Sequence, residues 1–292
     1  MNSKNQISIV IPAKNEAANL QALLKQIKTV APDAEILVID DGSTDDTSLI
    51  AKNADATVIK HPYSQGNGAA IKTGARKAKG DIIIFMDADG QHDPNDIPAL
   101  LAKLDEDYDM VVGARHISTQ SSWLRKIGNS FYNWLASIMT GHRIEDLTSG
   151  YRAVRADKFR KFLYLLPNGF SYPTTSTMAF FRSGFPVAYI PIHAGIRTGK
   201  SHISIIKDGI RFFIIILRIG ALFSPMRLFL PLSAVIFMIG LGYYGYTYFT
   251  ANRFTNMSGV LFISSLLIFL NGIISEQISS LHYKAAEDNR RT

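Results

Sequence analysis

The chain has 292 residues, contains no cysteine, and carries 31 Lys and Arg side chains against 24 Asp and Glu, a formal net charge of +7. This length allows one large domain or two smaller ones. The absence of cysteine excludes disulfide frameworks, thiolate nucleophiles and zinc-thiolate sites, and it indicates that the working part of the protein faces a reducing compartment.

The positive charge is concentrated in the last third of the chain. Residues 1–194 hold 21 basic and 20 acidic side chains, whereas residues 195–292 hold 10 and 4. The same C-terminal third contains the two longest uncharged runs, residues 228–252 and 254–275. At about 1.5 Å per helical residue, each run can cross a hydrocarbon core of about 30 Å. The composition therefore predicts a soluble domain joined to a membrane anchor and no nucleic-acid partner.

Short β-branched runs alternate with helical patterns in the first half of the chain. This alternation predicts an α/β fold, with a mostly parallel sheet covered by helices on both faces. Ligands of such sheets bind at the carboxyl ends of the strands. The expected strands are Ile7–Ile11, Glu35–Ile39, Ala56–Ile59, Asp81–Met86, Met110–Val112 and Val187–Ile192.

Two amphipathic helices are expected after these strands. The first is Trp123–Thr140, ended by Gly141, and its broad apolar face comprises Ile127, Phe131, Trp134, Leu135, Ile138 and Met139. The second lies within 203–224, where Lys207, Arg211 and Arg218 share one face opposite Ile and Phe. That pattern is typical of a helix lying in the lipid headgroup region, and a buried core helix is the alternative.

The expected organisation is a catalytic domain at 1–202, an interfacial helix segment at 203–224, and a transmembrane hairpin with a short tail at 225–292. Basic residues flank the hairpin on both sides, whereas its connecting loop carries only Arg253. The positive-inside rule then places the large domain and both termini in the cytoplasm, beneath a cytoplasmic or inner membrane. The polar N-terminus shows no signal peptide.

The strand expected at 81–86 runs into Asp87-Ala88-Asp89-Gly90-Gln91. Two neighbouring carboxylates repel each other, and a hard divalent cation such as Mg²⁺ or Mn²⁺ relieves that repulsion while keeping positions open for substrate phosphates. We therefore expect Asp87, Asp89 and Gln91 to bind the metal. A simple turn or helix cap is the alternative.

Two further strand ends carry polar residues. After 35–39 come Asp40 and Asp41, one of which is expected to accept a hydrogen bond from a nucleobase NH, while Ser43 or Thr44 caps the next helix. After 7–11 comes Glu16, which could equally be a helix-start carboxylate. The glycines at 66–68 fit neither the P-loop nor the Rossmann pattern. The histidines are unclustered in sequence, and we assign them no chemistry.

Three ordered segments closely resemble the motifs of family 2 inverting glycosyltransferases: IVIPAKNE at 9–16, VIDDGSTD at 38–45 and MDADGQHDP at 86–94. The last motif and the C-terminal hairpin resemble the branch that contains dolichol-phosphate mannose synthase and the bacterial polyprenyl-phosphate glycosyltransferases. The resemblance covers roughly residues 7–202 and implies a GT-A-like (Rossmann-like) fold. Similar proteins assemble as tetramers, which implies a homo-oligomer.

The resemblance also implies roles residue by residue. At the nucleotide-sugar it places Pro12, Ala13, Lys14, Glu16, Asp40, Asp41, Gly68, Asp87, Arg152, Arg197 and Lys200. At the acceptor phosphate it places Arg115, Arg125, Asn129 and Ser130. Asp89, Arg115 and Arg125 are expected to carry the catalysis. The chain departs from the pattern at Lys14, where the branch often has Tyr, and at Asn129, where the family often has Ser. Each arginine could instead be a solvated surface charge.

We therefore expect metal-dependent, inverting transfer of one sugar from a nucleotide-sugar to undecaprenyl or dolichyl phosphate at the membrane. A phosphate monoester is already anionic at pH 7, so the reaction requires no general base. The alternatives are a family 2 transferase that acts on a hydroxyl acceptor and a non-catalytic, membrane-anchored binder of nucleotide-sugars.

Overall fold

A computed structural model describes residues 6–115, 123–169, 171–192, 213–214, 217–218, 220–221 and 225–288. The chain forms two compact units. The first comprises Met1–Trp134 and Arg143–Phe212, and the second comprises Leu135–His142 and Phe213–Thr292. Most of the expected interfacial segment at 203–224 lies outside the described residues, so that helix and the predicted domain boundaries remain predictions.

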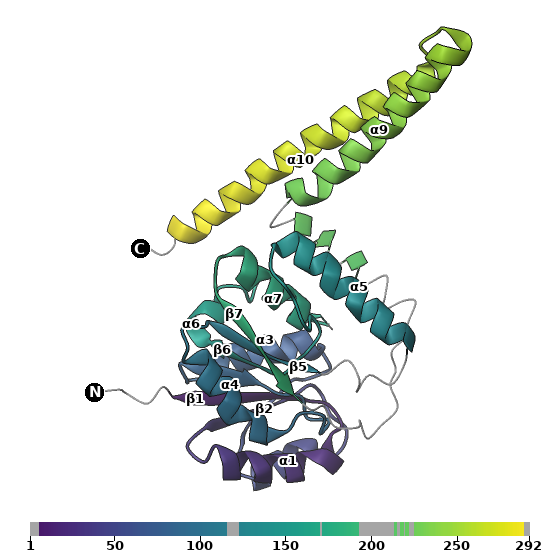
Figure 1. Cartoon of the computed structure of the whole chain (residues 1–292). Helices are drawn as coiled ribbons and strands as arrows, with labels where there is room; N and C mark the ends of the chain where they lie inside the picture. The colour runs from purple at the N-terminus through teal and green to yellow at the C-terminus, as the bar shows by residue number, and fades with distance from the viewer. Residues whose placement is uncertain are drawn as a thin grey trace. The chain divides into compact units, whose positions relative to one another are not determined.

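The first unit is built on one seven-stranded sheet with the strand order β3-β2-β1-β4-β6-β5-β7 (Figure 1). Every pair of neighbouring strands is parallel except the two pairs that involve β6. The mostly parallel sheet is thus confirmed, whereas β6 was not predicted. The strands are β1 (Ile7–Ala13), β2 (Glu35–Asp40), β3 (Thr57–Lys60), β4 (Ile82–Phe85), β5 (Met110–Arg115), β6 (Arg152–Arg155) and β7 (Val187–Ile192).

Helices cover both faces of this sheet, as the alternating pattern predicts. Ile9 and Ile11 of β1 join one buried cluster with apolar side chains of α1, α2 and α4. Val10 points to the other face, where α3 approaches so closely that a Cβ on Gly74 would lie 2.2 Å from Val10 Cγ1. The helical elements are α1 (Ala17–Val30), α2 (Thr47–Asn53), α3 (Asn67–Lys77), η1 (Pro94–Asp96), α4 (Ile97–Leu104), α5 (Trp123–Thr140), α6 (Ala156–Arg160) and α7 (Tyr172–Arg182).

The reversed strand β6 brings a loop to the functional edge of the sheet. Arg152 pairs with Phe85 of β4 on one side and with Val112 of β5 on the other, both antiparallel. The chain therefore enters β6 at the edge where β4 and β5 end. The Gly113 amide donates to the Tyr151 carbonyl at 2.9 Å, which holds the segment before β6 against the end of β5.

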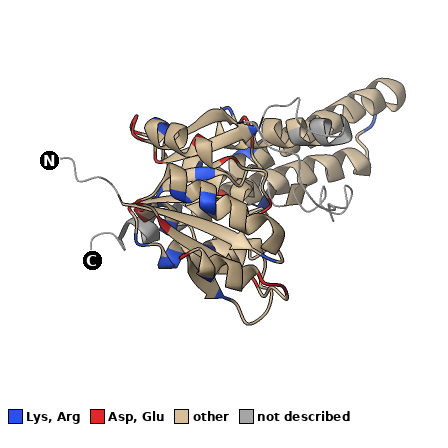
Figure 2. Cartoon of the chain, turned by 90° about the horizontal axis from the view of Figure 1, so that it is seen from below, with Lys and Arg blue, Asp and Glu red and all other residues tan. Residues whose placement is uncertain are grey.

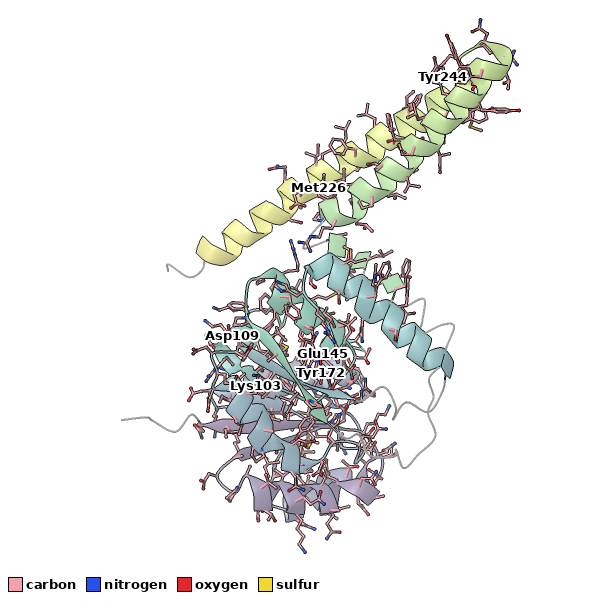
Figure 3. The ribbon with its side chains drawn as sticks, viewed as in Figure 1. Lys103, Asp109, Glu145, Tyr172, Met226 and Tyr244 are labelled. Atoms are coloured by element: carbon pink, nitrogen blue, oxygen red, sulfur yellow. The ribbon has the colours of Figure 1, made fainter. Side chains whose placement is uncertain are left out.

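The second unit contains a hairpin of two long helices, α9 (Pro225–Ala251) and α10 (Asn256–Asp288). Pro225–Ala251, with a mean hydropathy of 1.8, and Asn256–Ser279, with 2.1, are long and apolar enough to cross a membrane. Figure 2 shows both helices almost free of charged residues, and Figure 3 labels Met226 and Tyr244 toward the two ends of α9. Small residues mediate the helix contact: Ser265 Oγ donates to the Ser233 carbonyl at 2.9 Å.

The end of α5 is bound to the start of α9 within the second unit. Arg227 Nη1 donates to the carbonyls of Ile138 at 3.1 Å and Met139 at 3.3 Å, which lie in the last turn of α5. Gly141 has a φ of +79° and ends the helix, as predicted. Exposure of the predicted apolar face is mixed, because Ile138 is 45% exposed and Trp134 58%, whereas Met139 is only 2% exposed.

Close packing at Gly272 generates a stability prediction. A Cβ there would lie 2.8 Å from Phe229 Cβ, whereas a Cβ on Gly242 would meet nothing within 4 Å. We expect Gly272→Leu to destabilise the hairpin by about 1–3 kcal/mol through overpacking, and Gly242→Leu to have little effect. Thermal melting of the full chain in detergent measures both variants. Equal melting temperatures would show that the helices do not pack at Gly272.

Candidate active site

Acidic side chains converge at the edge of the sheet where the parallel strands end. Asp40 and Asp41 stand at the end of β2, and Asp87 and Asp89 follow β4. Arg115 is the last residue of β5. Because β1, β2, β4 and β5 point the same way, the sequence-predicted strand ends lie along one edge, where ligands of open α/β sheets bind.

Asp41 is saturated by hydrogen bonds from the loop after β3. Its Oδ1 accepts from the Gln65 amide and lies 2.8 Å from His61 Nδ1, and its Oδ2 accepts from Ser64 Oγ and from the Gly66 amide. Burial alone would raise the pKa of Asp41, but these donors outweigh burial and lower it. A carboxylate has about four acceptor positions, and these contacts occupy them in this structure, while the expected nucleobase contact stays a prediction.

Asp40 is equally committed to the protein interior. Its carboxylate is fully buried, accepts from the Ser43 amide at 2.7 Å and from Ser48 Oγ, and lies 3.7 Å from Lys60 Nζ. Burial opposes ionisation, but the hydrogen bonds from Ser43 and Ser48 and the charge of Lys60 lower the pKa of Asp40. Asp40 therefore has an internal structural role, and its expected nucleobase contact stays a prediction.

The predicted helix cap at Ser43 or Thr44 is wrong. Ser43 Oγ accepts from the Asn15 amide at 3.0 Å, and the Thr44 amide donates to Asn15 Oδ1 at 2.9 Å. At the start of α2, Asp45 Oδ1 instead accepts from the Thr47 amide at 3.1 Å. The hydroxyl-bearing segment after β2 thus fixes the loop after β1, where Asn15 adopts a φ of +56°.

The remaining candidates at the end of β1 and directly after it differ in their exposure. Ala13 is buried, Pro12 is half-buried and Lys14 is exposed. Lys14 Nζ donates to Ser64 Oγ at 3.1 Å, which places this cation beside the loop that Asp41 organises. Glu16 precedes α1 and accepts from Asn19 Nδ2 at 3.2 Å, in keeping with a helix-start carboxylate.

The segment after β4 forms a tight loop. The Asp87 amide donates to His92 Nδ1 at 3.1 Å, and the Gln91 amide donates to Asp89 Oδ1 at 3.2 Å. Gly90 makes the turn possible with a φ of +74°, a conformation that other residues rarely adopt. Sequence reasoning missed His92, because its partner is a main-chain amide and no pattern of side chains reveals such a contact.

Arg115 is oriented by a buried carboxylate that was not among the expected site residues. Its Nε donates to Asp146 Oδ2 at 2.8 Å and its Nη2 to Asp146 Oδ1 at 3.0 Å, a bidentate pair. Burial alone would lower the pKa of Arg115, but Asp146, followed by Asp87 and Asp89, raises it. Arg115 therefore has a fixed orientation and lies within the field of the Asp87 and Asp89 carboxylates.

Arg152 and Gly68 have internal roles where donor contacts were expected. The Arg152 side chain is fully buried, and its Nη1 donates to Ser176 Oγ at 2.8 Å and Thr177 Oγ1 at 3.1 Å, tying β6 to α7. A Cβ on Gly68 would lie 2.0 Å from the Pro167 carbonyl oxygen, so this glycine permits close packing of the loop before α7. Both residues therefore have structural roles, and their expected contacts with the donor stay predictions.

Four other expectations involve residues that the structure does not describe fully. The side chains of Arg125 and Asn129 on α5, and the whole of Arg197 and Lys200, lie outside the described part of the chain. Ser130, also on α5, is described and exposed. The predicted acceptor-phosphate and pyrophosphate contacts of these residues remain predictions.

The donor set after β4 fits a divalent cation that shares its coordination with a substrate. Among the residues that the structure describes, no three His, Asp or Glu side chains group as metal ligands. Asp87, Asp89 and Gln91 offer two carboxylates and an amide, the hard oxygen ligands that Mg²⁺ and Mn²⁺ prefer. Gly150 lacks a Cβ that would otherwise lie 2.8 Å from Asp87 Oδ2, so the carboxylate keeps its space.

Removal of the Asp146 carboxylate should destabilise the protein in a pH-dependent way. Burial would raise the pKa of Asp146, but Arg115 lowers it below the usual 3.8, so the stability it contributes is present at pH 7 and is lost as the pH falls below about 3.8. We expect Asp146→Asn to cost about 3 kcal/mol at pH 7, because it leaves Arg115 unpaired. The deficit should shrink in acid.

Thermal melting of the full chain at several pH values measures this difference. The matched control is Glu145→Gln, since that neighbouring side chain is exposed and should contribute little. A deficit that stays constant below pH 3.8 would contradict the assigned ion pair.

Comparison with known proteins places this geometry in a family. The model for glycosyl transferase family 2 matches residues 8–163, and that for the GtrB C-terminal hairpin matches residues 224–281. The chain is 36% identical over 169 residues to the uncharacterized protein MJ1222 of Methanocaldococcus jannaschii, covering 55% of this chain and 69% of that protein. It is 35% identical over 163 residues to the undecaprenyl-phosphate 4-deoxy-4-formamido-L-arabinose transferase of Proteus mirabilis, covering 52% of this chain and 49% of that enzyme.

The fold also resembles a solved glucosyl-3-phosphoglycerate synthase from Mycobacterium tuberculosis, in complex with Mn²⁺, uridine-diphosphate and phosphoglyceric acid. The TM-score is 0.62 at 21% identity, and the match covers 74% of this chain and 79% of that one. This likeness supports the GT-A-like fold. Because the family model covers residues 8–163, more than half of the chain, the protein belongs to glycosyl transferase family 2, and its last two helices form a GtrB-type C-terminal hairpin.

Proposed function

We propose that the protein transfers one sugar from a nucleotide-sugar to a polyprenyl phosphate, with inversion at the anomeric carbon. One observation carries this proposal. The same chain combines a site, in which the Asp87 and Asp89 carboxylates lie near an oriented Arg115, with two helices long and apolar enough to cross a membrane. The name of the Proteus mirabilis relative supports a lipid phosphate acceptor, since that enzyme is an undecaprenyl-phosphate transferase.

The donor binds where the strands end. Asp87, Asp89 and Gln91 would hold Mg²⁺ or Mn²⁺, which, when bound, stabilises the negative charge of the leaving nucleoside diphosphate. Pro12 and Lys14 line the nucleoside pocket, because Pro12 lies near the end of β1 and Lys14 directly follows it at the same edge, where Lys14 is exposed. Arg197 and Lys200, which the family resemblance places at the nucleotide-sugar, close over its pyrophosphate.

A phosphate acceptor requires cationic side chains to bind it, and it requires no general base because it is already anionic. A phosphate oxygen forms the bond to the anomeric carbon while the bond from that carbon to the diphosphate oxygen breaks. Arg115, already oriented by Asp146, and Arg125 on α5 orient the attacking phosphate, because guanidinium groups bind phosphate oxygens bidentately. Ser130 and Asn129 add polar contacts on the same helix. Catalysis then comes from positioning and fixed electrostatics.

The acceptor lipid explains the second unit. Its polyprenyl tail stays in the bilayer, so the site must reach a phosphate at the membrane surface. Basic residues flank the hairpin, and Arg253 alone lies in its connecting turn, which supports a cytoplasmic catalytic unit with both termini on that side. The segment 203–224 then lies along the headgroups, and homo-oligomers of this chain would array several sites on one membrane.

Replacing Asp89 by Ala should abolish transfer, because a cation ligand is lost. The assay uses the full chain in detergent with Mn²⁺, undecaprenyl phosphate and radiolabelled UDP-glucose, UDP-N-acetylglucosamine or GDP-mannose. Asp157→Ala is the matched control, since that carboxylate is 65% exposed on α6. Near-normal turnover by Asp89→Ala would contradict the proposed role of Asp89 as a metal ligand.

The product of the wild-type chain tests the acceptor class. A sugar joined to a lipid phosphate is released by mild acid, whereas a sugar joined to a hydroxyl is much more stable. An acid-stable product would favour a hydroxyl acceptor. Calorimetric binding of donors without any lipid product would favour a non-catalytic binder.

Replacing Arg125 by Met should raise the KM for undecaprenyl phosphate about tenfold to a hundredfold, the cost of about 1.5–3 kcal/mol for one charge-assisted hydrogen bond. The affinity for the donor should stay unchanged. Arg143→Met is the control, because its side chain is 89% exposed. An unchanged acceptor KM would show that Arg125 does not contact the phosphate.

A further inference from the structure

His92 has contacts that none of the roles described so far explains. It follows Gln91, is only 6% exposed, and its Nδ1 accepts the Asp87 amide proton at an N–N distance of 3.1 Å. The contact closes residues 87–92 into a ring, so the main chain at the first carboxylate is held by the residue that follows the last candidate ligand. The acceptor atom of residue 92 therefore holds the main chain of Asp87 in place.

The imidazole ring is itself held by the segment before β6. It stacks on the ring of Tyr151 with a centroid distance of 4.8 Å and an interplanar angle of 17°. Tyr151 is fully buried, and its hydroxyl donates to the Asp93 carbonyl at 2.9 Å. Tyr151 thus supports both the His92 ring and the main chain beyond it, which leaves Nδ1 little freedom to turn away from the Asp87 amide.

The contact fixes the chemical role of the ring. A main-chain amide can only donate, so Nδ1 is the acceptor and the ring proton lies on Nε2.

We propose that His92 is a positioning residue, which sets the main chain of Asp87 through its Nδ1 and so holds the Asp87 and Asp89 carboxylates at cation-binding spacing before the cation arrives. Without such a constraint, repulsion between the two carboxylates favours their separation. Residues that orient metal ligands typically alter metal affinity 10- to 100-fold when replaced. This inference rests on the metal role proposed above for Asp87 and Asp89.

Two substitutions separate the acceptor from the ring. His92→Phe keeps an aromatic ring for Tyr151 but removes the acceptor. His92→Asn loses the ring but places Oδ1 at the same bond distance from the main chain as Nδ1. We expect His92→Phe to weaken Mn²⁺ binding by the full chain in detergent about 10- to 100-fold, measured by electron paramagnetic resonance, and His92→Asn to restore most of it.

His61→Phe controls for the general loss of a buried histidine. His61 is also 6% exposed, but its Nδ1 faces Asp41, so this variant should retain Mn²⁺ affinity. If His92→Phe does not fold, as judged by thermal melting, His92→Asn carries the test alone. Loss of Mn²⁺ affinity in the folded Asn variant would then overturn the proposal.

Hydrogen exchange of the Asp87 amide, measured without metal, tests the positioning itself. Exchange should be faster in His92→Phe than in the wild type and slow again in His92→Asn. Unchanged exchange and unchanged Mn²⁺ affinity in His92→Phe would overturn the inference. If the wild type binds no Mn²⁺ while His92→Phe still exchanges faster, the proposed metal role fails and the positioning of Asp87 is supported.

Discussion

The concentration of negative charge at one edge of the sheet is the constraint on which the site depends. Parallel strands deliver Asp40, Asp41 and Asp87 to that edge, and like charges in a partly buried setting destabilise one another. Internal hydrogen-bond donors stabilise the charged form of the first two and lower their pKa despite burial. Arg115 pairs with Asp146 and also feels Asp87. The carboxylates after β4 are therefore the ones expected to bind a cation and its diphosphate.

That distribution of charge requires the reversed strand β6. A strand parallel to β4 and β5 would begin at the opposite edge and carry the segment before it away from Asp87. Because β6 runs antiparallel to both neighbours, the residues before Arg152 arrive at the functional edge. Asp146 can then pair with Arg115, and Tyr151 can stack on His92. The segment before the antiparallel strand β6 thus supplies a partner for Arg115 at the end of β5 and for His92 in the loop after β4.

The sequence predicts the elements of this fold better than the roles of its residues. Periodicity and apolar length identify the parallel strands and both long C-terminal helices, because those signals are local. The strand β6 escapes notice, since its four residues begin and end with arginine and show no long apolar run. The role of Asp41 depends on donors near residues 61–66, some 20 positions away, which no motif around Asp41 encodes. The internal contacts of Arg152 are not foreseen for the same reason, because their partners lie on α7.

The two buried histidines at this edge of the sheet hold loops of the site in place. A hydroxyl acceptor would need a group that removes its proton, such as a carboxylate or a histidine. At this edge of the sheet, His61 is bound between Asp41 and Thr73, and His92 between the Asp87 amide and Tyr151. Both rings are buried, and their hydrogen bonds hold the loops that carry Asp41 and Asp87. Fixed charges and fixed hydrogen bonds are sufficient when the acceptor is a phosphate, which is anionic before it binds.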